Sequence, residues 1–121
     1  MEHRDQEIYL LSRRLSKEAW IQYEAFREDV RRVIGNQWIR SIDSIGANFA
    51  EGSGRYGYPD RNRFNYIARG SLREAMHWTE LLKERNILDS SVADNLLAVL
   101  ENLAIKLNVQ IKNTRAQISG S

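Results

Sequence analysis

The stretch SIDSIGANFAEGSGR, residues 41–55, decides the fold. Its apolar residues recur every three or four positions, which is typical of an amphipathic helix. Gly46 lies inside that helix and costs about 1 kcal/mol relative to alanine, so it indicates a close approach by a second helix. Gly52 and Gly54 provide a natural helix end, and Pro59 prevents continuation. The stretch therefore predicts a closely packed helix followed by a sharp turn.

Helical periodicity continues on both sides of this stretch, and no segment alternates with period two for long enough to form a strand. We expect helices over about 6–23, 30–52, 61–85 and 91–117. A turn within 24–29 is required because one continuous helix to Gly52 would be too long for a small domain. Four helices joined by short turns predict an all-α, up-down-up-down antiparallel four-helix bundle, a single domain over residues 1–121.

Polar residues near the predicted turns are candidate helix caps. Asp29 and Asp60 precede the second and third helices, where a carboxylate can accept hydrogen bonds from free backbone N–H groups. Ser91 and Asp94 have the spacing of a capping box at the start of the fourth helix. The predicted inner face of the third helix consists of Phe64, Ile67 with Ala68, Ser71 with Leu72, Ala75, Trp78, Leu81 and Leu82.

The bulk composition sets limits on the class of protein. A length of 121 residues suits one domain with a real core. No cysteine is present, which excludes disulfides, thiolate metal sites and a cysteine nucleophile. The charged N-terminus lacks a signal core, and no apolar run reaches the roughly 20 residues of a membrane span. We expect a soluble, cytoplasmic protein with no membrane contact.

Basic residues are concentrated in one window of a chain whose total formal charge is only +2. Residues 55–73 contain five arginines and one acidic residue, Asp60, for a net charge of +4. The five are Arg55, Arg61, Arg63, Arg69 and Arg73. Tyrosine and phenylalanine are interleaved with them, and arginine with aromatic side chains suits phosphate pairing and base stacking in RNA or DNA. Two alternatives are pairing of the arginines with carboxylates within the bundle and contact between subunits through exposed tyrosines.

Three other patterns do not support catalysis or a cofactor. Residues 52–57 spell G-x-G-x-x-G, but the dinucleotide site needs a preceding strand, and here a helix precedes. Glu74 and His77 have the spacing of a di-iron ligand pair, but the second pair is missing. Glu51 and Glu74 are not accompanied by a recognisable nucleophile and base. We therefore expect no metal, no cofactor and no enzymatic activity.

A structural explanation fits the polar residues on the inner sides of the second and third helices better. They are predicted to form a buried network that fixes the register of the two helices. Its members are Arg40, Asn48, Glu51, Ser71 and Glu74.

Two motifs also resemble a known family. The first is Q-x-x-R-S-x-x-S-I-x-x-N-x-A-E-G-x-G-R over residues 37–55, and the second is F-x-x-I-A-R-G-S-L-x-E over residues 64–74. Together they resemble the signatures of the bacterial four-helix-bundle proteins, also called intervening-sequence proteins of the large-subunit ribosomal RNA. The likeness covers about residues 6–115.

The resemblance implies a four-helix bundle that assembles as a ring-shaped homopentamer, with no known catalysis. The related accessory variability determinant of diversity-generating retroelements binds nucleic acid and a reverse transcriptase, which extends to this chain only by analogy. We expect a non-enzymatic oligomer that binds RNA or a ribonucleoprotein partner through the five arginines. The alternative is an interaction scaffold with no nucleic-acid role. Its spare apolar surface for oligomerisation would be Trp20, Ile21, Trp38, Leu97 and Ile105.

Overall fold

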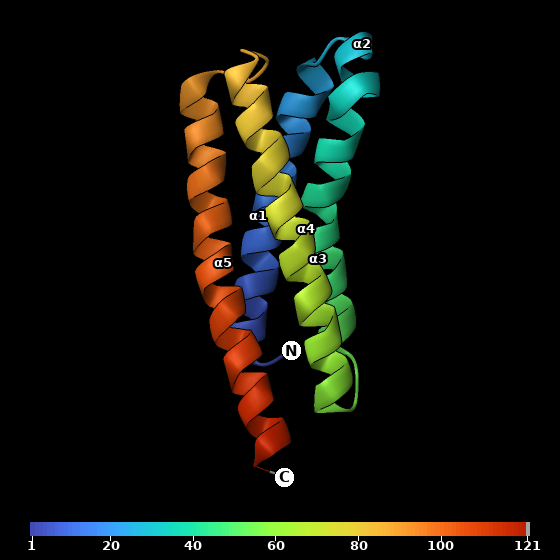
Figure 1. Cartoon of the computed structure of the whole chain (residues 1–121), viewed down its shortest axis with the longest axis vertical. Helices are drawn as coiled ribbons and strands as arrows, with labels where there is room; N and C mark the ends of the chain where they lie inside the picture. Colours follow the sequence, from blue (N-terminus) through green and yellow to red (C-terminus); the bar gives the residue numbers. More distant parts are fainter. Residues whose placement is uncertain (121) are drawn as a thin grey trace.

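Long helices lie side by side along the long axis of the molecule in this computed structural model, which describes residues 1–120 (Figure 1). The elements are α1 (His3–Ala25), α2 (Glu28–Val30), the π-helical turn η1 (Arg31–Gly35), α3 (Asn36–Ser53), α4 (Tyr58–Glu84) and α5 (Ser90–Ser119). α3 packs against α1 and α4, and α5 packs against α4 and α1. The predicted all-α four-helix bundle is confirmed, and residues 1–120 contain no strand.

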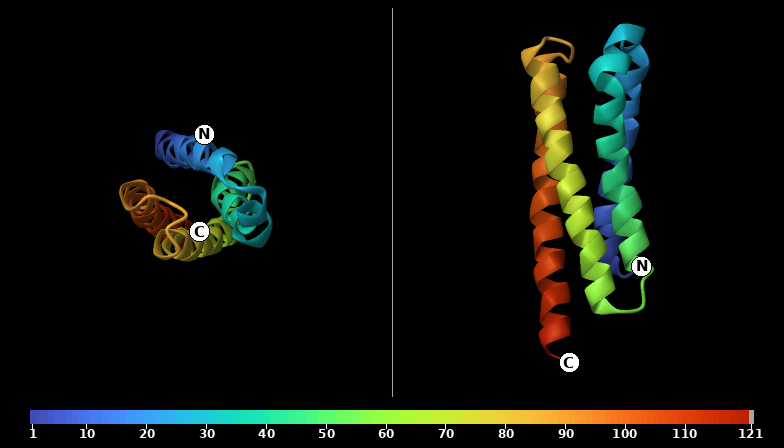
Figure 2. Two further views of the ribbon diagram at one scale, coloured as in Figure 1. Left: turned by 90° about the horizontal axis from the view of Figure 1, so that it is seen from above. Right: turned by 45° about the vertical axis from the view of Figure 1, so that its right-hand side comes forward.

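The chain runs up and down the bundle, so its connections lie at two ends (Figures 1 and 2). The N-terminus, the α3–α4 loop and the end of α5 lie at one end, which we call the loop end. The turn before α2 and the α4–α5 connection lie at the other. This topology places the arginine window at the loop end and along the lower half of α4.

Apolar side chains from all four long helices fill the interior. Trp38 is the largest buried side chain, and its Nε1–H donates to Thr79 Oγ1 at 2.9 Å. Thr79 in turn donates to the carbonyl of Ala75 at 2.7 Å. The indole was predicted to be spare surface for oligomerisation, and this was wrong because the indole N–H has a partner inside the bundle.

The turn between α1 and α2 lies in the predicted range although it contains no glycine or proline. Phe26 and Arg27 adopt extended backbone conformations. The Phe26 ring packs on Trp38 with a centroid distance of 5.6 Å. A Cβ at Gly35 would lie 3.1 Å from the Phe26 ring, so this glycine makes room for it. The turn is thus set by tertiary packing of one aromatic ring.

Close approach of helices was predicted correctly at Gly46, and the structure shows a second one at Gly52, which was predicted only as a helix end. A Cβ on Gly46 would lie 2.6 Å from Ser12 Oγ of α1. At the loop end, a Cβ on Gly52 would lie 2.7 Å from Phe64 Cβ and 3.1 Å from the Arg61 carbonyl oxygen. The two glycines therefore allow α3 to lie against α1 and α4 respectively.

The helix caps differ from prediction in three places. α4 begins at Tyr58 with Pro59 in its first turn, so Asp60 is already helical and is not a cap. At α5 the cap is Asp89, which accepts from the Ser91 backbone N–H at 3.1 Å. Asp94 pairs with Lys83 of α4 instead of closing a capping box. The third candidate, Asp29, lies inside α2, whose N-cap is Arg27, and accepts only from the N–H of the next residue, Val30, at 3.0 Å.

The buried face of α4 agrees with the predicted one at Ala68, Leu72, Ala75 and Leu82. It differs at three positions, because Asn62, Asn65 and Thr79 are buried in place of Phe64, Ile67 and Trp78. Its buried residues are Asn62, Asn65, Ala68, Leu72, Ala75, Thr79 and Leu82. Polar side chains can lie inside because they satisfy one another: Asn65 Nδ2 donates to Asn62 Oδ1, and Asn62 Nδ2 donates to the Ile111 carbonyl. As a result Ile67 is pushed to the surface, with 40% of its area exposed.

Candidate nucleic-acid interface

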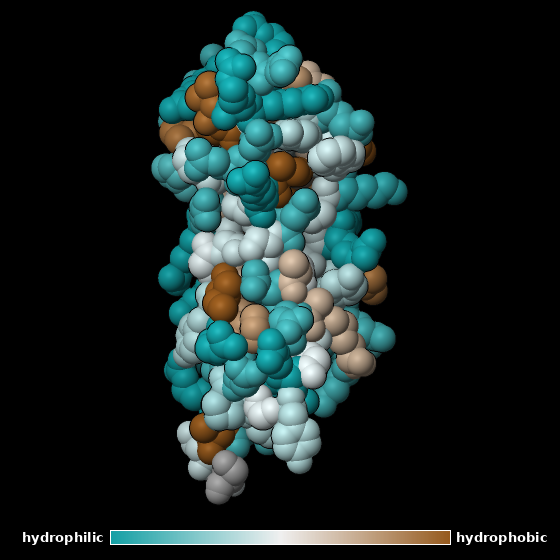
Figure 3. All heavy atoms as spheres, turned by 90° about the vertical axis from the view of Figure 1, so that its right-hand side faces the viewer, coloured by the Kyte–Doolittle hydropathy of each residue, from teal (hydrophilic) through white to brown (hydrophobic). Residues whose placement is uncertain are grey.

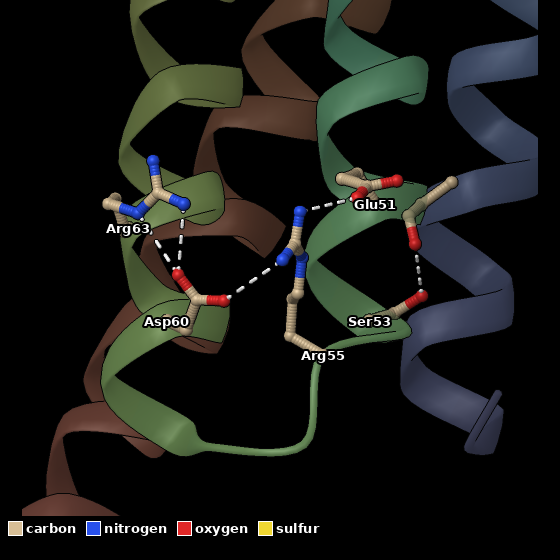
Figure 4. A network of polar contacts seen from close by, with 6 residues as sticks. Glu51, Ser53, Arg55, Asp60 and Arg63 are labelled. Atoms are coloured by element: carbon tan, nitrogen blue, oxygen red, sulfur yellow. Dashed lines mark hydrogen bonds and ion pairs between the residues drawn. The ribbon is translucent and has the colours of Figure 1, made fainter.

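The α3–α4 loop is held by a chain of ion pairs (Figure 4). Arg55 Nη2 lies 2.7 Å from Glu51 Oε1, and Arg55 Nη1 lies 3.5 Å from Asp60 Oδ2. The other oxygen of Asp60 lies 3.0 Å from Arg63 Nη2. We call Glu51, Arg55, Asp60 and Arg63 the loop-end cluster. Its two arginines are matched by two carboxylates, so its formal charge is zero.

Phe64 lies beneath the loop-end cluster. The guanidinium carbons of Arg55 and Arg63 lie 4.9 Å and 4.6 Å from the centre of its ring. An arginine over an aromatic face is attracted by the ring quadrupole, and the ring also fixes the plane of the guanidinium. The loop itself projects Tyr56, whose side chain is fully exposed to solvent.

Arg61 faces a different part of the loop end. Its Nε–H donates to the Arg55 carbonyl at 2.6 Å, and its guanidinium lies 5.2 Å from the centre of the Tyr58 ring. It lines an open hollow of about 860 Å³ between the ends of the four helices. Burial, with help from nearby Glu2, raises the pKa of the Asp5 carboxyl in the same hollow, and Arg61 opposes that rise. Because acids and bases line it together, the hollow is not selective for phosphate.

Arg69 and Arg73 lie higher on α4 and away from the loop-end cluster. Arg69 Nη1 donates to Asn108 Oδ1 of α5 at 3.2 Å, and its guanidinium lies 4.9 Å from the centre of the Tyr66 ring. Arg73 is exposed one turn further along the same helix. Four of the predicted arginines thus form two groups, Arg55 with Arg63 and Arg69 with Arg73, instead of one continuous face. Arg61 lies apart from both, in the hollow.

A residue outside the predicted window joins the second group. Arg115 of α5 donates to the hydroxyl of Tyr66, so Tyr66 contacts two guanidiniums, one on its ring and one on its hydroxyl. Arg115 lies 49 residues from Tyr66 in the chain. The sequence contains one indication that Arg115 belongs with this group. Asn108, Lys112 and Arg115 have helical spacing, which places them on one side of α5.

The predicted buried polar network is formed only in part. Ser71 of α4 hydrogen-bonds to Ser44 of α3 at 2.8 Å, and Asn48 Nδ2 donates to Ser44 Oγ at 2.9 Å. This small cluster links α3 to α4, as expected for Asn48 and Ser71. Its connecting residue is Ser44, which was not among the predicted members of the network.

The charged members of that network lie outside the interior, and their assignment was wrong. Arg40, Glu51 and Glu74 are all exposed. Glu51 pairs with Arg55, and Glu74 accepts from Trp78 Nε1 at 3.1 Å. The reason is geometric: Ile42, Ile45 and Phe49 occupy the inward side of α3, which turns Arg40 and Glu51 toward solvent.

The remaining chemistry of the described residues is sparse. Residues 1–120 hold no group of three or more histidine and acidic side chains that could bind a metal ion. His77 packs edge-on against Trp78, with ring centres 4.9 Å apart. Within the same range, none of the helices is long and apolar enough to cross a membrane.

Comparison with known proteins gives one family and one fold. The model of a family described as 23S rRNA-intervening sequence protein matches residues 4–109. Among solved structures, a protein of unknown function from the S23 ribosomal protein family of Bacteroides thetaiotaomicron is similar, with a TM-score of 0.84 and 22% identity. The match covers 90% of this chain and 98% of that one. At this identity the likeness shows the fold alone. No curated protein matches.

Proposed function

The chain belongs to the 23S rRNA-intervening sequence protein family, and we propose that it is a non-enzymatic protein that binds RNA, alone or in a ribonucleoprotein. The observation that carries this proposal is the stacking of arginine on aromatic rings along α4. Four of the five window arginines lie over a ring at 4.6 to 5.2 Å. They do so on the outside of a bundle whose interior is already filled.

The physical basis is the double role of arginine. Its planar fork donates to phosphate oxygens, and its face stacks on bases and rings. A ring beneath the guanidinium fixes its plane before a ligand arrives, which reduces the entropy lost on binding. The fully exposed Tyr56 beside these arginines offers a face on which an unpaired base can stack. The family description, which names an rRNA, is consistent with RNA as the ligand.

Salt dependence tests this proposal. Phosphate contacts release counterions, so RNA affinity should fall steeply as salt is added. A titration of fluorescein-labelled RNA by anisotropy, at about 50 and about 200 mM salt, is the measurement. A random-sequence RNA suffices, because the phosphate contribution does not depend on sequence. No salt-sensitive binding by the wild-type protein would contradict the proposal.

Oligomerisation is the second part of the proposal, and exposed apolar side chains support it. Ile21, Val33 and Ile105 have 57%, 65% and 66% of their area exposed. In the view onto the α2–α3 side, apolar residues form separate areas within a mainly hydrophilic surface (Figure 3). Several copies could cover such areas at once. A homopentamer is the state we propose, in the cytoplasm, and light scattering coupled to size exclusion tests the subunit number. A monomer at micromolar concentration would contradict it.

The same exposed side chains support the alternative, an interaction scaffold that binds a protein partner and no nucleic acid. The two functions make opposite predictions for added RNA. If the protein is a scaffold, it should assemble into an oligomer and show no binding to RNA even at low salt.

A further inference from the structure

The two groups of arginines differ in the chemistry of their partners. Arg55 and Arg63 are paired with the carboxylates of Glu51 and Asp60. Arg69 and Arg115 are held by neutral groups, the amide of Asn108 and the ring and hydroxyl of Tyr66. In the part of the chain that the structure describes, no carboxylate lies within ion-pair distance of Arg69, Arg73, Lys112 or Arg115.

These cations lie in two facing rows. On α4, Tyr66, Arg69 and Arg73 are spaced at three and four residues, so they share one side of the helix. On α5 the matching set is Asn108, Lys112 and Arg115. The helices are antiparallel neighbours, and the contacts from Arg69 to Asn108 and from Arg115 to Tyr66 join the two sets. We call these six residues the α4–α5 row.

The side chains of this row are accessible to a ligand. Arg73, Asn108, Lys112 and Arg115 are exposed, and 37% of Tyr66 is exposed. Gly70 lies between Arg69 and Arg73, and a Cβ there would meet nothing within 4 Å. The row is therefore open to a ligand as extended as a nucleic-acid backbone.

We propose that the α4–α5 row is the phosphate-binding surface for RNA, and that the loop-end cluster is a structural clamp. This assignment rests on the proposed function and refines it. Arg69 and Arg115 bind phosphate oxygens directly, and Arg73 and Lys112 extend the contact along the backbone. Tyr66 is a positioning residue that holds the two guanidiniums at one place between the helices.

RNA phosphates are expected to bind the row in preference to the loop-end cluster because of the partner that each arginine must lose on binding. Arg55 and Arg63 must lose a charge-assisted partner before they can bind a phosphate. Arg69 and Arg115 exchange a neutral partner for a charged one, which strengthens their hydrogen bonds. The loop-end cluster also presents two carboxylates that repel the RNA backbone.

A pair of matched double variants tests the assignment on the full chain. Arg69→Gln/Arg115→Gln removes two charges from the row, and Arg55→Gln/Arg63→Gln removes two from the loop-end cluster. The probe is labelled single-stranded RNA of about 20 nucleotides, titrated at several salt concentrations. We expect the row variant to lose about tenfold or more in affinity at low salt and about 1.4 in the slope of log affinity against log salt. We expect the loop-end variant to lose less than about threefold.

The loop-end variant leaves the carboxylates of Glu51 and Asp60 unpaired, which increases their repulsion of RNA. This control therefore overestimates the contribution of the loop-end arginines to RNA binding, and the comparison is biased against the assignment. Equal losses in the two variants, or a larger loss at the loop end, would overturn the assignment while leaving RNA binding itself intact. Absence of binding by the wild-type protein would overturn both. Displacement of the RNA by poly-glutamate as effectively as by unlabelled RNA would show that the row takes an acidic protein, and would also overturn the assignment.

Tyr66→Phe tests the positioning role. It keeps the ring under Arg69 and removes only the hydroxyl that accepts from Arg115. We expect about a threefold weaker affinity with an unchanged salt slope, since no charge is lost. The thermal midpoint should stay at its wild-type value. Unchanged affinity in this variant would remove Tyr66 from the assignment, and a lowered midpoint with proportionate loss of binding would make its role structural.

Discussion

The loop-end cluster and the α4–α5 row each contain arginines and meet along α4, where Arg63 and Arg69 are six residues apart, yet their arginines have different kinds of partner. In the loop-end cluster the partners are carboxylates: Asp60 bridges Arg55 and Arg63 across the start of α4. In the row the partners are an amide and a phenol. An arginine's surroundings, and not its presence in a basic window, therefore decide whether its charge is available to a ligand.

Two glycines, Gly52 at the loop end and Gly70 beside the row, also differ in how closely they are packed. At the loop end the helices touch at Gly52, whereas Gly70 beside the row faces open space. We expect Gly52→Ala to destabilise the protein by about 1–3 kcal/mol, because its Cβ would collide with Phe64 Cβ and the Arg61 carbonyl. Urea unfolding followed by circular dichroism measures the change.

Gly70→Ala is the matched control for that variant. It should stabilise the protein by about 0.5–1 kcal/mol, since alanine is the better helix former and nothing obstructs its methyl group. Equal effects of the two substitutions would show that the loop end is not a packed structural clamp.

The next largest effect is expected when a loop-end arginine loses its carboxylate partner and so becomes similar to the arginines of the α4–α5 row. Asp60→Asn removes the carboxylate shared by Arg55 and Arg63. It should free Arg63 for phosphate contact and leave Arg55 paired with Glu51 alone. We expect RNA affinity to rise about fivefold at low salt. The loss of stability should stay below about 1 kcal/mol because these ion pairs are solvent-exposed. Unchanged or weaker RNA affinity, measured by the same anisotropy titration, would count against the role of carboxylate pairing.

The smallest predicted effect comes from a substitution that keeps the positive charge and removes the planar guanidinium group. Arg69→Lys keeps the charge but loses the planar group that stacks on Tyr66 and donates to Asn108. We expect about a twofold weaker RNA affinity and an unchanged salt slope. The matched substitution Arg63→Lys should leave affinity unchanged within error. If both lysine variants bind like wild type, the row acts through charge alone.

Much of the fold could be predicted from local patterns. Helical periodicity predicts the four long helices, and glycine inside a helix predicts the close approach at Gly46. The turn before α2 was placed correctly from length alone. Its cause, the Phe26 ring against Trp38, is a tertiary contact that no local pattern encodes. The same holds for the inward asparagines of α4, which are tolerated only because they satisfy each other and a carbonyl of α5.

The site was less accessible to sequence reasoning. A window rich in arginines identifies residues that are close in the chain, but it does not show which partner each one has. The contacts from Arg69 to Asn108 and from Arg115 to Tyr66 join two helices. Glu51 was expected to be buried, and it instead neutralises Arg55 four residues later. Arg115 was missed because its contact with Tyr66 joins two helices across 49 positions. The division into two groups depends on these partners, so it required the structure.

Side-chain ¹H–¹⁵N correlation spectra of the arginine Nε–H groups test the central claim most directly. The spectra are recorded on the wild-type protein with and without single-stranded RNA, and assigned with the single Arg→Gln variants. The account predicts that the signals of Arg69 and Arg115 shift on RNA addition while those of Arg55 and Arg63 stay in place. Shifts confined to Arg55 and Arg63, with Arg69 and Arg115 unmoved, would contradict it.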